Sequence, residues 1–363
     1  MKVGDSECYK AGTDFNLSST AGKCQCLQKY FGPHCGIPES AWHSYYRTHS
    51  KELNKLRPRK LSRRLIHGLQ VNHEIEFFEA RMKMLDNAVD VYLLLESNYT
   101  AYGSGKDLLF LEKLSSGWLS EYHQKIQYIF LSFFPKEAET SGWYADSFLR
   151  SFLGQQGMKM LENVRDDDIF LLTDADELPS PESLLFLKMF DGWTEPVKFS
   201  FRWNVYGFFW LQPSTTSIHV ACTVAMLRDV YGNNAISLRR SWNEKVHRGR
   251  LDNFTLTHSR PQEWTLGDAP HYAGWHCSWC YSPAGIKLKL QSAQRDDKPR
   301  WGDFPDKLDL QYIARLIRTG EWFDGNHPFK PVKRETTPVE LHAPPFFLEN
   351  EKRFEYLLEP PQS

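Results

Sequence analysis

Apolar and polar positions along the first half of the chain alternate between the two periods of regular secondary structure. Four short apolar runs bounded by polar residues are typical of strands, and they cover residues 63–71, 89–98, 125–134 and 167–177. Two longer stretches repeat apolar residues at helical spacing, over residues 73–85 and 141–164. Strands that alternate with helices in this way predict an α/β fold with a mostly parallel central sheet.

The second half of the chain follows a different pattern. It is β-rich and aromatic over 197–211, 214–227 and 268–282, and residues 309–320 have the spacing of a short amphipathic helix. We divide the chain into a cysteine module (1–38), a basic connector (39–64), an α/β domain (65–335) and a proline-containing C-terminal wrap (336–363). The lysines and arginines of the connector are expected to be solvated, with an anionic partner as the alternative.

The apolar run at 169–172 ends in an acidic segment that contains Asp174, Asp176 and Glu177. The carboxyl ends of parallel strands meet at one edge of a sheet, where open α/β sheets bind ligands. Because Asn72 and Glu96 end two other predicted strands, we expect these side chains to line one crevice.

Two carboxylates spaced as Asp174 and Asp176 at a strand end can share one hard divalent cation. Mg²⁺ and Mn²⁺ prefer oxygen ligands and commonly combine one or two carboxylates with phosphate oxygens. The segment therefore suggests a metal–nucleotide site. In the alternative interpretation, Asp176 or Glu177 caps a helix that begins near Pro181.

Composition excludes some classes of protein. The 363 residues carry 44 Lys and Arg against 45 Asp and Glu, which argues against a general nucleic-acid binder. No window has the apolar length of a membrane span, and the amino terminus lacks the apolar core of a signal peptide.

The cysteines and sequons nevertheless indicate the secretory pathway. Four of the seven cysteines crowd the first 36 residues, and three Asn-x-Ser/Thr sequons begin at Asn16, Asn98 and Asn253. We therefore expect the native protein to have a targeting segment or membrane anchor that this chain lacks. A glycan on Asn98 would conflict with burial of that residue against a nucleotide.

Residues 21–36, AGKCQCLQKYFGPHCG, resemble the second half of an EGF-like unit. Four cysteines allow three pairings, and this resemblance implies Cys8–Cys24 and Cys26–Cys35. So small a module has little core, so disulfides are expected to hold it. Of the later cysteines, Cys222, Cys277 and Cys280, at most one pair can form. The Cys-x-x-Cys spacing is not expected to be redox-active, because strand residues three apart point to opposite faces.

Five blocks of sequence resemble those of the family 17 glycosyltransferases. In chain order they are NHEIEFFEARMKML, VYLLLESNYTAYG, DDDIFLLTDADELPSPE, HYAGWHCSWC and LHAPPFFLENEKRFEYLL. The resemblance implies a GT-A-type nucleotide-sugar fold that transfers GlcNAc from UDP-GlcNAc, with inversion, in β-1,4 linkage to the core β-mannose of N-glycans. It also implies a type II Golgi membrane protein whose soluble luminal portion is this chain, and Mn²⁺ as cofactor, with Mg²⁺ as the alternative.

The resemblance also implies roles for individual residues. Asp174 and Asp176 are expected to hold the metal against the UDP diphosphate. His276 is expected to complete the metal shell, with an ordinary core histidine as the alternative. Glu177 is expected to order a water or an arginine beside the metal, or to point into the helix start.

Donor binding and proton transfer involve other residues. Glu96 and Asn72 are expected at the uridine or ribose, and Arg150 at Asp174 or a phosphate, with a structural salt bridge as the alternative. Inverting transfer needs a base near the acceptor hydroxyl, for which Asp268 is our candidate. The competing acids are Asp303, Asp296 and Glu263.

Three alternative functions remain open from sequence. One is a transferase that uses a different nucleotide sugar. Another is a secreted, Ca²⁺-dependent carbohydrate-binding or adhesion protein, which would ignore UDP. The third is a metal-dependent hydrolase, which would split a UDP-sugar without a glycan acceptor.

Overall fold

The computed structural model describes residues 2–4, 6–139, 142–214, 216–240, 245–292 and 299–361. Its strands are β1 Lys2–Val3, β2 Ser6–Glu7, β3 Tyr30–Phe31, β4 Ile37–Pro38, β5 Arg57–Pro58, β6 Leu65–Val71, β7 Val91–Ser97, β8 Ile126–Leu131, β9 Ile169–Leu172, β10 Glu177–Pro179, β11 Phe190–Asp191, β12 Val197–Val205, β13 Gly207–Leu211, β14 Thr216–Thr223, β15 Trp264–Leu266, β16 Gly274–Ser278 and β17 Lys330–Pro331. Its α-helices are α1 Phe15–Ala21, α2 Glu39–Ala41, α3 Ile75–Met84, α4 Leu109–Ser115, α5 Gly142–Gly157, α6 Pro181–Met189, α7 Val224–Asp229, α8 Ala235–Arg240, α9 Arg248–Phe254, α10 Pro283–Ser292, α11 Leu310–Thr319, α12 Val339–His342, α13 Pro345–Glu349 and α14 Glu351–Leu358.

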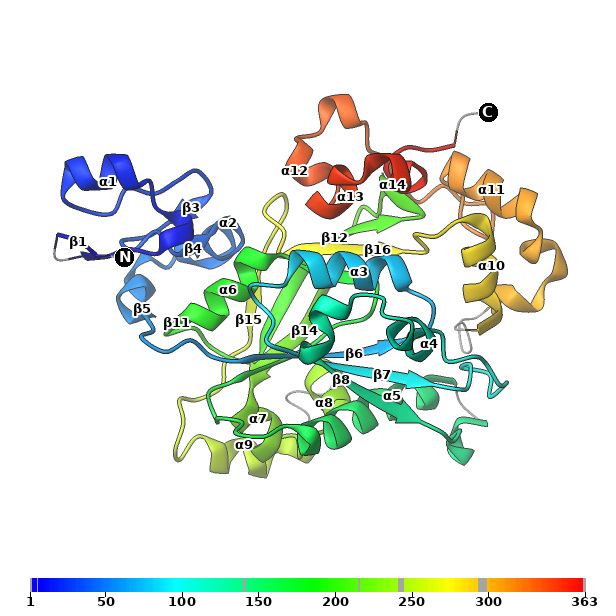
Figure 1. The fold of residues 1–363 in the computed structure, drawn as a ribbon, viewed down its shortest axis with the longest axis horizontal. Coiled ribbons are helices and arrows are strands. Elements are labelled where there is room, and N and C mark those ends of the chain that lie inside the picture. Colours follow the sequence, from blue (N-terminus) through cyan, green and yellow to red (C-terminus); the bar gives the residue numbers. More distant parts are fainter. Residues whose placement is uncertain are drawn as a thin grey trace.

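One large sheet runs through the centre of the molecule, with strand order β10-β16-β12-β14-β9-β6-β7-β8 (Figure 1). The four strands predicted in the first half pair in parallel, β6 with both β7 and β9, and β7 with β8. The chain leaves β6 toward β7 and β8 on one side and returns to β9 on the other. Such a reversal of strand order opens a crevice at the carboxyl ends of the strands. The α/β class with a large, mostly parallel sheet is confirmed.

Period-two alternation in these strands buries both faces of the sheet. In β9, Ile169 and Leu171 belong to one core cluster, and Phe170 and Leu172 belong to the other. The first cluster is covered by α3, α4 and α6, and the second by α5, α7 and α8, which lie on opposite sides of the sheet in Figure 1. Near-continuous apolar runs are typical of strands buried on both faces.

The second half of the chain extends this same sheet. β14 pairs antiparallel with β9, and β12 pairs antiparallel with β14 and parallel with β16. The strands of the second half therefore extend the sheet beyond β9. They do not form a separate layer. The predicted helix at 309–320 is α11, which Asp309 caps at its start and Gly320 ends in the left-handed conformation.

The disulfides of the amino-terminal module are Cys8–Cys24 and Cys26–Cys35, as the EGF resemblance implies. Cys277 and Cys280 form a third disulfide, and Cys222 is a buried free thiol. Cys277 and Cys280 were expected to point to opposite faces of one strand. They do not, because β16 ends at Ser278 and the chain then turns. None of the described helices combines the length and apolarity that a membrane crossing needs.

The predicted connector packs partly against the α/β domain, so only some of its basic residues are solvated. Tyr46 is 1% exposed and contacts the rings of Phe186 and Trp264. Arg63 is also buried, and its guanidinium bonds the Phe190 carbonyl and the Asp191 carboxylate. Arg63 therefore helps to fix this segment to the core, whereas Lys51, Lys55, Arg57 and Lys60 are exposed.

The C-terminal segment contributes to the core as well as covering it. Phe346, Phe347 and Phe354 of α13 and α14 form a cluster with Phe77 of α3 and Phe208 of β13. In Figure 1 these helices lie beside α3 above the sheet. The predicted wrap is thus a helical layer held by aromatic contacts.

Replacement of Phe347 tests whether this layer is part of the cooperative core. Phe347 is 0% exposed and touches four aromatic rings. We expect Phe347→Ala to lower the free energy of unfolding by about 3–5 kcal/mol, because it removes buried area and leaves a cavity. Denaturant unfolding measures this value. Val339→Ala, at a position 68% exposed, is the control, and equal stability of the two variants would contradict the assignment.

Candidate active site

The acidic segment forms a tight turn between two strands. β9 ends at Leu172, β10 begins at Glu177, and the Glu177 N–H donates to the Asp174 carbonyl at 3.1 Å. Ser180, whose side chain accepts the Ser183 N–H, caps the helix that follows. The interpretation of Asp176 or Glu177 as the cap is therefore wrong. β10 pairs with β16 so that Glu177 lies opposite His276.

A buried arginine holds the backbone of this turn. Arg81 of α3 is 0% exposed, and its guanidinium donates to the carbonyls of Asp174 at 2.9 Å, Ala175 at 3.2 Å and Glu177. Burial lowers the pKa of Arg81 to about 10, a value at which it stays charged at neutral pH. Three carbonyls of the turn thus share one cation.

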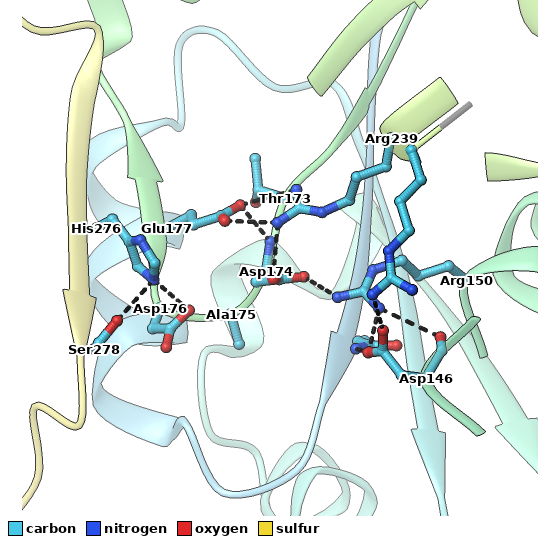
Figure 2. A network of polar contacts seen from close by, with 12 residues as sticks. Asp146, Arg150, Thr173, Asp174, Ala175, Asp176, Glu177, Arg239, His276 and Ser278 are labelled. Atoms are coloured by element: carbon cyan, nitrogen blue, oxygen red, sulfur yellow. Dashed lines mark hydrogen bonds and ion pairs between the residues drawn. The ribbon is translucent and has the colours of Figure 1, made fainter. Parts of the chain in front are cut away.

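Asp174 is held by two arginines (Figure 2). Arg150 of α5 donates to Oδ1 at 2.5 Å, and Arg239 of α8 donates to Oδ2 at 2.8 Å and to Glu177 at 2.7 Å. The Asp174 N–H donates to Glu177 Oε2 at 2.8 Å. Burial would raise the pKa of Asp174, but Arg150 and Arg239 outweigh it and hold that pKa well below its usual range.

Asp176 points the other way, toward a lysine and a histidine. Lys289 of α10 donates to Oδ2 at 3.2 Å, and His276 Nε2 lies 3.6 Å from Oδ1. His276 also contacts the Ser278 hydroxyl at 3.0 Å and stacks on Trp203. Burial would raise the pKa of Asp176, but Lys289 and His276 lower it on balance. Asp176 is therefore an ionised carboxylate at neutral pH.

The donor set of Asp176 and His276 suits a divalent cation. Their side chains are 13% and 14% exposed, and a carboxylate oxygen next to an imidazole nitrogen leaves other positions for phosphate oxygens and water. Asp174 fits the predicted metal role less well, because both its oxygens already accept hydrogen bonds from arginines. In the described part of the chain, the one cluster of three ligand atoms within 4.8 Å lies elsewhere.

A cavity of about 430 Å³ opens at the carboxyl ends of the parallel strands. Its size is in the range of small-molecule sites. The polar residues that line it include Gln70, Asn72, Glu74, Ser97, Lys106, Asp146, Arg150, Asp174, Asp176, Arg239, Arg240 and Lys289. Asn72, Asp174 and Asp176 therefore meet in one crevice, as their positions at strand ends predict, and Arg150 of α5 lines the same crevice.

Glu96 is not in that crevice. Its carboxylate is 0% exposed and accepts hydrogen bonds from the N–H groups of Phe110 and Leu111, which begin α4, and from the Tyr128 hydroxyl. Alternation along β7 explains the difference, because Ser97 faces the cavity and its neighbour faces the other side. The predicted ribose contact is replaced by a structural role at the helix start.

Asp268 does not line the cavity either. β10 and β16 are antiparallel, and Pro179 at the end of β10 lies opposite Gly274 at the start of β16. Residues before Gly274 therefore lie near the end of β10 that is farther from Asp174. Among the competing acids, Asp303 pairs with Arg300, and Glu263 pairs with Lys198 and His219. Asp296 lies outside the described residues. This placement does not support Asp268 as the base.

Four residues of the site escape the sequence prediction, namely Arg81, Arg239, Lys289 and Glu74. A signal for Arg81 was present, since it shares the helical spacing of Phe77, Phe78 and Met82 and so belongs to the buried face of α3. Nothing comparable marks Arg239 and Lys289. They lie 65 and 113 positions after the acids they contact.

A crevice at a reversal of strand order, lined by acids and several cations, is typical of α/β proteins that bind phosphorylated ligands. The sequence comparisons identify the family within that class. The Glycosyltransferase family 17 model matches residues 32–223. The chain belongs to glycosyltransferase family 17, which confirms the resemblance stated from the five sequence blocks.

The chain is also similar to three proteins whose names state an activity. Beta-1,4-mannosyl-glycoprotein 4-beta-N-acetylglucosaminyltransferase of Homo sapiens and that of Rattus norvegicus are each 45% identical to it over 340 residues. The Mus musculus protein of the same name is 44% identical. Each alignment covers 93% of this chain and 62% of the relative. The chain thus spans less than two thirds of the length of these relatives.

Replacement of Arg81 tests its hold on the turn. We expect Arg81→Met to lower the free energy of unfolding by about 1–3 kcal/mol, because buried carbonyls lose their donor. Denaturant unfolding measures this value. Lys83→Met, at an exposed position of the same helix, is the control; equal stability of both variants would refute the role.

Proposed function

We propose that this chain transfers GlcNAc from UDP-GlcNAc in β-1,4 linkage to the core β-mannose of N-glycans, with inversion and with a divalent metal. The activity stated in the names of the relatives supports the reaction. The observation that carries the proposal is the cavity of about 430 Å³ in which the Asp174–Asp176 turn meets five cationic side chains. A nucleoside diphosphate sugar is the kind of ligand that matches this charge pattern.

The donor diphosphate would lie at the acidic turn. Arg239 and Lys289 already contact the carboxylates there and could each bond a phosphate oxygen. Asn72 and Ser97 line the same cavity and offer hydrogen bonds to uracil or ribose, in place of Glu96. Asp176 and His276 would hold Mn²⁺, or Mg²⁺. The bound metal would neutralise the diphosphate and stabilise charge on the leaving group.

Glu74 is our candidate for the general base. Besides the acids of the turn, Glu74 and Asp146 are the carboxylates that line the cavity. Asp146 forms ion pairs with Arg150 and Arg240, which weaken it as a base. Glu74 accepts hydrogen bonds from the Asn72 and His73 N–H groups at 2.8 and 3.0 Å. It would take the proton of the mannose hydroxyl as that oxygen attacks the anomeric carbon and the bond to UDP breaks.

The Golgi lumen is the proposed location. Three disulfides suit an oxidising compartment, and Asn16 and Asn253 are exposed sequon positions on α1 and α9. The proposed partners are therefore UDP-GlcNAc and the N-glycans of glycoproteins that pass through this compartment.

The test is UDP release from UDP-GlcNAc with a biantennary N-glycan acceptor, in Mn²⁺ and after chelation with EDTA. We expect UDP release only when both acceptor and metal are present. In Asp176→Asn we expect the rate of release to fall about a hundredfold, because an amide lacks the negative charge that binds the metal. Asp303→Asn, at a surface acid, is the control. Mass and linkage analysis of the product completes the measurement.

The other outcomes each contradict a part of the proposal. Release without acceptor indicates a hydrolase. UDP binding without release from UDP-GlcNAc indicates another donor or acceptor, and glycan binding with Ca²⁺ but no affinity for UDP indicates a lectin. Full activity in EDTA would remove the metal from the mechanism.

Replacement of Glu74 tests its proposed role as the general base. Glu74→Gln keeps an oxygen that can accept the two backbone N–H groups, so the fold should persist. We expect kcat to fall on the order of 10²- to 10⁴-fold with little change in the affinity for UDP. Glu79→Gln on the same helix, where the acid pairs with Arg353 at the surface, is the control. Near-normal kcat in Glu74→Gln would exclude it as the base.

A further inference from the structure

A second set of metal-ligating side chains lies outside the cavity. Glu39, His43 and His271 each offer one ligand atom, and these atoms all lie within 4.8 Å of one another. His271 Nδ1 is 3.9 Å from Glu39 Oε1, and the two imidazole rings stack with centroids 3.7 Å apart. All three side chains are partly exposed, so an ion from solvent can reach them.

Two distant segments of the chain bring these ligands together. Glu39 begins α2, and a single π-helical stretch, Trp42–Tyr46, continues it. Residues four apart on a helical turn share a face, which puts Glu39 beside His43. His271 comes from the loop between β15 and β16. The Gly267 N–H donates to the Ser40 carbonyl at 3.0 Å and fixes this loop against the helical turn.

The arrangement of the two imidazoles disfavours a pair of protons at this cluster. Stacked rings at 3.7 Å repel one another when both are protonated. The Asp268 carboxylate acts on His43 electrostatically and adds negative charge near the cluster. Two imidazoles and a carboxylate are a donor set typical of zinc.

We propose that Glu39, His43 and His271 bind one Zn²⁺ ion that clasps the segment after the cysteine module to the β15–β16 loop. Glu39 and His271 also line a second cavity of about 480 Å³, between the amino-terminal module and the C-terminal helices. The clasp therefore stabilises one wall of that cavity. It shares no residue with the cavity at Asp174 and Asp176, and it is independent of the proposed transferase activity.

The experiment is calorimetric titration of Zn²⁺ into the untagged, EDTA-treated and dialysed full chain, with metal content measured by mass spectrometry. We expect about one bound Zn²⁺ per chain in Asp176→Asn, in which the proposed donor-site metal is removed, and a rise in melting temperature, because a ligand that binds only the folded state stabilises it. Loss of one ligand in His43→Asn or His271→Asn should weaken binding by roughly tenfold or more. His271 lies in a partly exposed loop, so its variant is expected to fold even if the His43 variant does not.

Two controls separate this cluster from other metal sites. His49→Asn changes an exposed histidine of the same segment and should keep the zinc. Asp176→Asn removes the acid at the proposed donor site and should keep it too. Failure of the wild type to bind Zn²⁺ would reduce the cluster to an ion pair and a ring stack. Unchanged affinity in His271→Asn would also overturn the proposal.

Discussion

The geometry of the site depends on one buried cation beneath the acidic turn. The Arg81 guanidinium gathers three backbone carbonyls, and a turn that presents three carbonyls to one side needs such a donor inside a core. With the backbone fixed, Asp174 and Asp176 point in opposite directions, one toward α5 and α8 and the other toward β16 and α10 (Figure 2). Two acids separated by a single residue thereby acquire different surroundings.

Charge balance follows from this division. The acids Asp174, Asp176 and Glu177 contact the cations Arg150, Arg239 and Lys289, so the formal charges of these six groups cancel. Burial of the carboxylates is tolerable only because each is paired. A diphosphate bound beside these six groups would bring negative charge that none of their pairs offsets.

The sequence predicted the sheet and the acidic turn well because both rest on local periodicity. Asn72 and Asp174 were found by strand-end logic, since parallel strands bring their carboxyl ends together whatever their order. The prediction that Glu96 lines the crevice was wrong, because its neighbour Ser97 is the residue on the cavity side of β7. Arg239 and Lys289 could not be predicted, because their partners are set by the packing of α8 and α10, which no local pattern encodes.

The pairing of β10 with β16 has a consequence for how the chain assembles. Glu177 meets His276, and Asp176 meets Lys289, across about a hundred residues of intervening sequence. Because closing such long loops costs chain entropy, we expect these contacts to form after the local helices. A nascent chain released before α10 would have the acidic turn without its lysine. The order of synthesis thus makes ligand-binding competence one of the last properties this fold acquires.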